Sequence, residues 1–222
     1  GRFWSASRDG TLCQWDAARG NGFDLLRTGR NGDLAHAVDP DRPRIATLGS
    51  AGSLVLWDTV TGDPLARNDA SLLENFAPID AVFLPSDGDL LVSTRSAGLM
   101  RLDANTLEVV DSGSVRGGAR LTLSPDGQWV ALARENGARI TEIEDLDAER
   151  VLEGVAHPTG FQFQSDGSAV WVAEPSGNLG LWSLSEAVPK LLRSVQVPGG
   201  IFGLAGRGSQ LAVGTGDGRV EL

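Results

Sequence analysis

Cysteine is almost absent from this chain, which limits its possible cross-links. Cys13 is the only cysteine, so no internal disulfide can form. A protein without disulfides fits a reducing compartment, and we therefore expect a cytoplasmic location. Cys13 lies among apolar neighbours in a strand-like segment, which favours a small buried side chain over a reactive thiol.

Histidine and lysine are equally scarce, and this excludes several kinds of active site. His36 and His157 are the only histidines, and with Cys13 they are too few and too scattered for a structural zinc site. The one lysine, Lys190, lies in AVPKLL and not in a phosphate-binding Gly-x-x-x-x-Gly-Lys-Ser/Thr motif. No Gly-x-Ser-x-Gly nucleophile motif occurs, although His157 could in principle act as a general base. We expect no catalytic residue, metal or cofactor.

Positive charge is in deficit as well. The formal net charge is −10, which disfavours nucleic acid and anionic membrane surfaces as partners. No apolar run approaches the roughly 18 residues that a membrane span needs, and no signal peptide is visible. The acidic run 144–149 has carboxylates at a spacing that could hold Ca²⁺, but it lacks the glycine of a wrapped loop. We interpret it as a solvated connection. The glycine-rich GTGDG at 214–218 is followed by a strand-like segment, which indicates a tight turn and not a dinucleotide site.

What the chain does contain is an internal repeat. The segments RDGTLCQWD, SAGSLVLWD, SAGLMRLD and PSGNLGLWS share one pattern: a small turn residue, alternating apolar positions, a bulky residue and a polar one. NGARITEIE is a fainter copy, and GDGRVEL begins another. Copies recur roughly every 40 residues, which is the length of a β-propeller blade. The bulky and polar positions are Trp15 and Asp16, Trp57 and Asp58, Leu102 and Asp103, and Trp182 and Ser183.

A hairpin signal precedes each copy. LPSDGDLLVS at 84–93, SPDGQWVALA at 124–133 and QSDGSAVWVA at 164–173 place a turn between two apolar runs, and DPDRPRIATL at 39–48 is a variant. Each repeat therefore predicts four strands: a and b around this turn, c with the bulky and polar pair, and a weaker strand d. About twenty-two strands are expected in all. Helical periodicity is absent apart from 70–75, which could hold a single turn.

The period, the Asp-Gly turns and above all SASRDGTLCQWD make the chain similar to the WD-repeat family of β-propellers. Two features depart from the family pattern. The Gly-His dipeptide is missing, since His36 falls inside a strand a and His157 lacks the preceding glycine. The family's turn aspartate is matched only by Asp9 and Asp217. The resemblance therefore implies an incomplete His–Ser–Asp–Trp network in every blade, with apolar packing holding the blades together.

We predict an all-β fold: a single β-propeller domain over 1–222 made of four-stranded antiparallel blades. The expected divisions are a partial blade at 1–28, blades at 29–68, 69–113, 114–153 and 154–195, and a partial blade at 196–222. The two partial blades do not complete each other, although ring closure normally protects strand edges. We therefore expect mainly that the sequence holds about five to six blades of a seven-blade ring and belongs to a longer chain. The alternative is a six-bladed ring.

In such a propeller every loop lies on one of two faces. The face with the a–b and c–d loops collects an excess of carboxylates, whereas on the other face arginines are balanced by acidic residues such as Glu174. Arginine and aromatic groups favour protein binding. We therefore predict a partner site on the balanced face, and the alternative is that its arginines only solubilise the loops. The predicted residues are Arg8, Arg30, Phe76, Arg95, Arg116, Arg134 and His157.

The resemblance implies a non-catalytic scaffold or sensor that binds a protein or peptide, with other domains of the same parent chain as further partners. The alternative is an enzymatic propeller, lactonase-like or hydrolytic, with carboxylates or histidines at a central channel. The expected starts of strand a supply mostly apolar or small residues instead: Leu34, Ile79, Ala119, Gly160 and Ile201.

Two weaker signals complete the sequence analysis. Trp4, Trp129 and Trp171 fall near the same register of strand b, and we interpret them as packing between blades and not as a recognition stripe. Arginine is abundant and lysine is nearly absent, which favours a bacterial, GC-rich genome.

Overall fold

Strands are the only regular secondary structure in the described part of the chain. The computed structural model describes residues 2–6, 11–16, 23–27, 33–49, 53–68, 78–113, 119–134, 137–207 and 210–221, with side chains from residue 36 onward except that of residue 207. These residues form strands β1 to β22 and contain no helix. The all-β class is therefore confirmed, whereas the segment 70–75 lies outside the described residues.

The chain divides into two compact units, residues 1–118 and 119–222. In the first unit the described strands form one three-stranded and two four-stranded antiparallel sheets, each in chain order. The first sheet is β1 (Arg2–Ala6), β2 (Thr11–Asp16) and β3 (Phe23–Arg27); the second is β4 (Asp33–Val38), β5 (Arg44–Gly49), β6 (Leu54–Asp58) and β7 (Pro64–Asn68); the third is β8 (Pro78–Phe83), β9 (Leu90–Thr94), β10 (Gly98–Leu102) and β11 (Val109–Ser112).

The second unit is built in the same way, from two four-stranded sheets and one three-stranded sheet among its described residues. The first is β12 (Arg120–Leu123), β13 (Trp129–Arg134), β14 (Gly137–Glu142) and β15 (Asp145–Leu152); the second is β16 (Gly160–Phe163), β17 (Ala169–Ala173), β18 (Asn178–Ser183) and β19 (Lys190–Gln196); the third is β20 (Ile201–Arg207), β21 (Gln210–Thr215) and β22 (Val220–Glu221).

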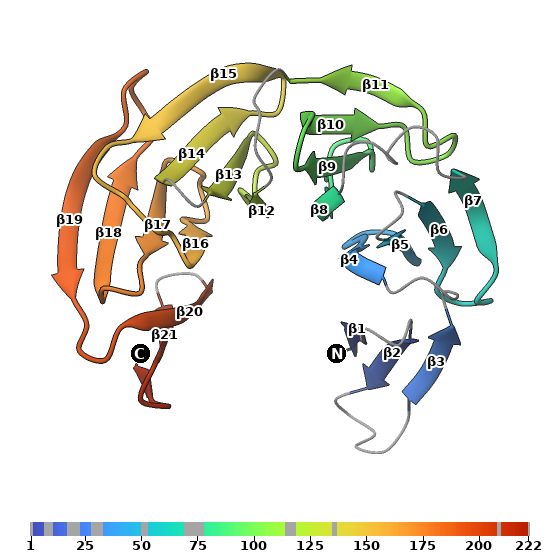
Figure 1. The fold of residues 1–222 in the computed structure, drawn as a ribbon, viewed down its shortest axis with the longest axis horizontal. Helices are drawn as coiled ribbons and strands as arrows, with labels where there is room; N and C mark the ends of the chain where they lie inside the picture. The colour runs from blue at the N-terminus through green and yellow to red at the C-terminus, as the bar shows by residue number, and fades with distance from the viewer. Residues whose placement is uncertain are drawn as a thin grey trace. The chain divides into compact units, whose positions relative to one another are not determined.

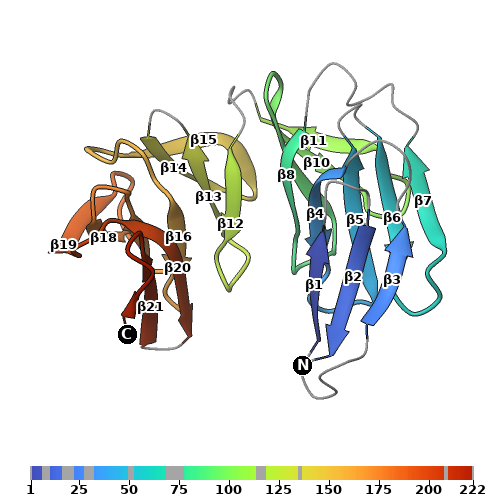
Figure 2. The same ribbon diagram turned by 60° about the horizontal axis from the view of Figure 1, so that its bottom comes forward.

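Successive sheets within each unit pack through their first strands. β1 contacts β4 and β4 contacts β8 in the first unit, while β12 contacts β16 and β16 contacts β20 in the second. Figure 1 shows the sheets of each unit side by side, and Figure 2 shows the same first strands next to one another. Each unit therefore holds consecutive blade-like sheets, as the repeat predicted.

Burial explains why the second and third strands of each repeat are the most apolar. Every residue of β5 and β9 is buried, and β6 and β10 are buried but for one residue each. The fourth strands β11 and β19 are almost wholly exposed. This difference accounts for the strong sequence signal of strands b and c and the weak signal of strand d.

In the two four-stranded sheets of the first unit, the aspartate of the repeated pair caps the turn that follows the third strand. Asp58 Oδ1 accepts the backbone N–H groups of Val60 at 2.7 Å and Thr61 at 3.1 Å. Asp103 Oδ1 accepts those of Asn105 and Thr106 in the same way, each at 2.8 Å. Short polar side chains satisfy turn N–H groups in this manner. The aspartate of the repeated pair is thus explained by local turn geometry.

Tryptophan at the preceding position joins two strands of one sheet. The indole N–H of Trp57 on β6 donates to Thr47 Oγ1 on β5 at 3.0 Å, and both side chains are buried. Trp182 is buried in the cluster that fills the space between the first two sheets of the second unit. Trp15 and Asp16 lie on β2, where the backbone alone is described. Asp9 lies outside the described residues.

Arginines also link neighbouring sheets, which adds to the expected apolar packing. Arg44 at the start of β5 is 8% exposed and donates from Nη2 to the carbonyl oxygen of Gly88 in the next sheet at 2.6 Å. Its Nε donates to Asp39 Oδ2 at 2.6 Å, and its guanidinium carbon lies 5.0 Å from the ring centroid of Phe83. A buried charge needs such partners. Apolar contacts alone therefore do not hold the sheets together.

Candidate functional site

Three of the predicted partner residues have described side chains. Arg95 is exposed in the turn between β9 and β10, and His157 is exposed in the connection between β15 and β16. Arg134 ends β13, and its Nη2 donates to Glu149 Oε1 on β15 at 2.8 Å. Arg95 belongs to the first unit and the other two to the second, so a common surface stays a prediction. The other four residues lie outside the described part: Arg8, Arg30, Phe76 and Arg116.

Asp217, the second match to the family's turn aspartate, lies in the turn between β21 and β22. It is exposed, and its Oδ1 accepts the hydroxyl of Thr215 at 2.5 Å. Its Oδ2 lies 3.5 Å from Arg219 Nε. The turn itself confirms the interpretation of 214–218 as a link between two strands. Within the described residues Asp217 thus serves its own turn and does not enter a buried network.

Glu174 is the acidic residue whose place the sequence did not reveal. It was grouped with the surface charges, yet its exposed fraction is only 7%. Oε1 accepts the backbone N–H of Ala156 at 2.9 Å and that of His157 at 3.5 Å, and Oε2 accepts Asn178 Nδ2 at 2.9 Å. Glu174 therefore positions the connection that carries His157.

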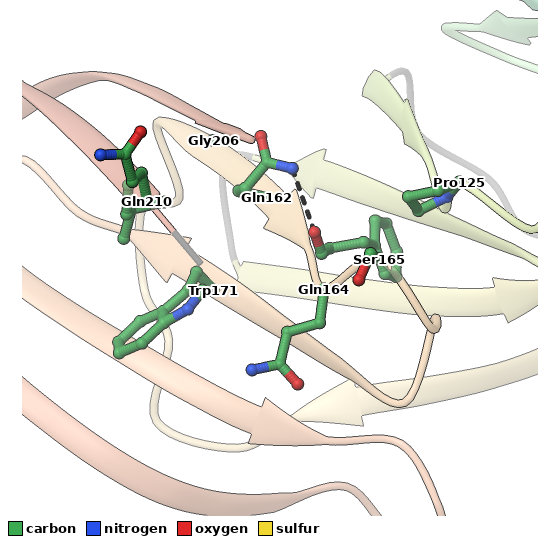
Figure 3. A pocket seen from close by; sticks show the side chains of 9 residues that line it. Pro125, Gln162, Gln164, Ser165, Trp171, Gly206 and Gln210 are labelled. Carbon is green, nitrogen blue, oxygen red and sulfur yellow. Dashed lines mark hydrogen bonds between the residues drawn. The ribbon is translucent and has the colours of Figure 1, made fainter. Parts of the chain in front are cut away.

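A hollow of about 300 Å³ opens in the second unit between the sheet of β16–β19 and the sheet of β20–β22. This volume lies at the lower end of the range of small-ligand sites, about 300–1,000 Å³. Figure 3 shows Trp171 and Gln210 on one side, Pro125 and Ser165 on the other, and Gln162 and Gln164 between them. The nine lining residues are Pro125, Gln162, Phe163, Gln164, Ser165, Trp171, Gly206, Gln210 and Leu211.

Strand register explains how the hollow is assembled. Gln162 on β16 pairs directly with Trp171 on β17, so both side chains lie on the same face of the sheet. Gly206 on β20 faces them, and a Cβ atom there would lie 2.7 Å from Gln162 Cγ. The glycine therefore leaves room for the Gln162 side chain. Trp171 is half-buried and packs with Leu204 and Leu211 against the core beneath.

The lining chemistry is polar but uncharged. Among the nine lining residues there is no Asp, Glu, His, Lys, Arg or Cys. Ser165 is exposed, and none of the other lining side chains could act as its base. The side-chain amide of Gln162 donates to the carbonyl oxygen of Phe163 at 3.0 Å. The hollow can therefore offer hydrogen bonds and an indole surface, but no acid–base or nucleophilic chemistry.

A second hollow, of about 390 Å³, lies in the same unit between the sheets of β12–β15 and β16–β19. Asp126, Asp166 and Glu186 give it an acidic lining, which agrees with the expected excess of carboxylates in these turns. Hydrogen bonds from Ser168 lower the pKa of Asp166 below its usual 3.8. Arg150 lies in this hollow and already donates to two of its backbone carbonyl groups.

Three tryptophans were predicted to pack between blades, and Trp4 is one whose backbone alone is described, on β1. Trp129 and Trp171 are half-buried and pack against core clusters, as expected for residues between sheets. Each also borders one of the two hollows.

The acidic run 144–149 was expected to be a solvated connection, but most of it forms the beginning of β15.

No cluster of three or more His, Cys, Asp or Glu side chains suited to a metal occurs in the described part of the chain. Within the same residues, no helix is long and apolar enough to cross a membrane. No protein-family model matches the chain, and no curated protein matches it either.

Proposed function

We propose that the chain is a stretch of a WD-repeat-like β-propeller that acts as a non-catalytic binding module for a protein or peptide. The observation that carries this proposal is the uncharged hollow beside Trp171. It combines three carboxamides with an aromatic surface, and its one side-chain hydroxyl, that of Ser165, has no base among the lining residues. Such a site binds a ligand without changing it.

The sheets around the hollow support this function because they hold their side chains in fixed positions. The turn between β16 and β17 is capped by Asp166, whose Oδ1 accepts the backbone N–H of Ser168 at 3.1 Å and its hydroxyl at 2.8 Å. Arg150 joins the sheet of β16–β19 to the preceding sheet of the same unit. Binding residues placed on rigid elements lose little conformational freedom when a partner binds. The single cysteine is consistent with a cytoplasmic module, and the abundance of arginine over lysine is consistent with a bacterial one.

A displayed random-peptide library tests the proposal. We expect the purified chain to enrich peptides that bind as synthetic copies with dissociation constants on the order of micromolar. The same preparation should leave generic ester and lactone substrates unchanged. Failure to enrich any peptide with a dissociation constant below about 1 mM would overturn the proposed function. Turnover of a lactone or ester would replace it with the enzymatic alternative.

Two sets of variants then locate the binding surface. Charge reversal by Arg95→Glu with Arg116→Glu tests the partner site predicted from the sequence. Trp171→Ala tests the hollow, which contains none of the predicted partner residues. Loss of affinity in the first set alone would assign binding to the arginine surface, and loss in the second alone would assign it to the hollow. Binding that survives both sets would contradict both locations.

A further inference from the structure

We infer that the hollow beside Trp171 recognises an uncharged, extended peptide segment that lays a proline ring on the indole. This inference rests on the proposed binding function and specifies its ligand. It follows from three properties of the lining: its lack of charge, its free carboxamide groups and its flat aromatic surface.

The lack of charge selects against ionic ligands. The whole chain carries a formal net charge of −10, yet the nine residues around this hollow are all neutral. A cationic ligand finds no counter-charge inside it, and an anionic ligand is repelled by the protein as a whole. Affinity must therefore come from stacking and hydrogen bonds, which salt screens only weakly.

The carboxamides match the backbone of a peptide. The side chain of Gln162 has one hydrogen bond, to the carbonyl oxygen of Phe163. The amide groups of Gln164 and Gln210 make no hydrogen bond to another described residue. Each carboxamide offers two N–H donors beside one acceptor. Together they can donate to the successive carbonyl groups of an extended segment.

A proline-rich segment offers free carbonyl groups to the carboxamides and an apolar ring to the indole. A polyproline II segment makes no internal hydrogen bonds, so its carbonyl groups are free to accept from side-chain amides. Proline also has no N–H that would need a partner, and its ring is rigid and apolar. Such segments bind in grooves lined by aromatic residues. About 300 Å³ accommodates roughly two to three residues, so one proline can lie on Trp171 while its neighbours reach Gln162 and Gln164.

Gly206 provides the sharpest test of this geometry. A Cβ atom at this position would lie 2.7 Å from Gln162 Cγ, which is closer than real Cβ contacts allow, and 3.0 Å from Gln162 Cδ. Gly206→Ala must therefore displace the Gln162 side chain. The variant removes no hydrogen-bonding group and no ring, so a loss of binding reports the added methyl group together with the displaced Gln162 side chain.

The experiment uses an acetylated and amidated hexaproline peptide, titrated into the whole chain by isothermal titration calorimetry. We expect Trp171→Ala and Gly206→Ala each to weaken binding at least about tenfold. Trp171→Phe, which keeps an aromatic ring, should weaken it less. The matched control is Trp129→Phe, because Trp129 borders the other hollow and lies beneath Arg150. It should change affinity less than about twofold, as should a rise from about 50 to 500 mM NaCl.

An assigned nuclear magnetic resonance signal keeps the inference testable if Trp171→Ala does not fold. The indole N–H signal of Trp171, identified by its loss in Trp171→Phe, should shift on addition of hexaproline, while that of Trp129 should not. Equal shifts of both signals, or of neither, would overturn the inference.

The remaining outcomes separate this inference from the proposed function. If library peptides bind but hexaproline does not, the ligand class is wrong and the binding function stands. Binding of maltohexaose in place of hexaproline, with loss in Trp171→Ala, would make the hollow a site for neutral saccharides and overturn the peptide assignment. If no peptide of any composition binds, the proposed function itself fails.

Discussion

Arg150 lies over the indole of Trp129, with its guanidinium carbon 4.3 Å from the ring centroid. From β15 the same guanidinium donates to the carbonyl oxygens of Leu184 at 3.0 Å and Glu186 at 2.9 Å in the next sheet. Its Nη2 also donates to Glu142 Oε1 at 2.5 Å. One side chain thus joins two consecutive sheets and covers the face of a half-buried tryptophan.

Removing this link should destabilise the second unit. We expect Arg150→Ala to lower the free energy of unfolding by about 2 kcal/mol, because a cation–π contact and hydrogen bonds of a charged donor are lost together. Arg150→Lys should recover only part of this loss, since an ammonium cannot reproduce the planar fork. Urea unfolding followed by tryptophan fluorescence measures both variants. The control is Arg193→Ala on the exposed strand β19, expected to change stability by less than about 0.5 kcal/mol. Equal losses in Arg150→Ala and Arg193→Ala would contradict the assigned role.

The buried pair of Asp39 and Arg44 predicts a loss of stability in acid. Burial alone would raise the pKa of Asp39, but the Arg44 side chain and the backbone N–H groups of Asp41 and Arg42 bring it below its usual 3.8. A carboxyl group whose pKa is lower in the folded state stabilises the fold above its unfolded pKa, and this contribution disappears as pH falls through the folded pKa.

Asp39→Asn should therefore be less stable than the parent near neutral pH and should lose less stability between about pH 5 and pH 2. The matched control is Asp63→Asn, because Asp63 is an exposed aspartate in a turn of the same sheet. Thermal unfolding across this range gives the measurement. If the stability of Asp39→Asn fell with pH as steeply as that of the parent chain, the Asp39–Arg44 pair would not contribute to the pH dependence of stability.

Leu107 occupies a backbone conformation that elsewhere in the repeat belongs to glycine. Its φ is +58°, and Gly62 at the same place in the preceding sheet's turn has a φ of +80°. Leu107 is nevertheless fully buried in the core of the first unit. We expect Leu107→Gly to destabilise by roughly 2–4 kcal/mol, because the lost burial exceeds the relief of about 1–2 kcal/mol of strain. Gly62→Ala should cost about 1 kcal/mol through strain alone. A stabilised Leu107→Gly variant in urea unfolding would show that strain outweighs packing.

Local patterns sufficed to predict the strands, because the alternation of apolar and polar residues and the choice of turn residues both depend on neighbouring positions. The pair Trp57 and Asp58 marked the end of a third strand, and the turn at 214–218 was expected where it occurs. The number of strands expected from the repeat agrees with the strands of the described residues.

The candidate site could not be predicted in the same way, because its parts come from different sheets. Gln162 and Trp171 become neighbours through strand register, and Gly206 reaches them from the next sheet. No spacing in the sequence indicates that contact. Arg150 likewise binds backbone carbonyl groups more than thirty residues away, which leave no side-chain signature. Glu174 was placed on the surface because it stands in a turn, and turn residues do not reveal whether a neighbouring connection will cover them.

Glu174 also gives a prediction about motion. Its carboxylate accepts the N–H groups of Ala156 and His157, so these amides should open rarely in the parent chain. Glu174→Ala removes both acceptor oxygens and leaves the Nδ2 group of Asn178 without this acceptor. We expect hydrogen exchange at Ala156 to accelerate at least about tenfold and the free energy of unfolding to fall by about 2 kcal/mol.

The conservative variant separates charge from hydrogen bonding at this position. Glu174→Gln keeps one oxygen that can accept the N–H of Ala156, so its exchange should stay closer to that of the parent chain. Glu153→Ala, an exposed glutamate in the same connection, serves as the control and should leave exchange at Ala156 unchanged. If Glu174→Ala left that rate unchanged as well, the carboxylate would not be what holds the connection, and the packing of Val155 against the core would have to hold it instead.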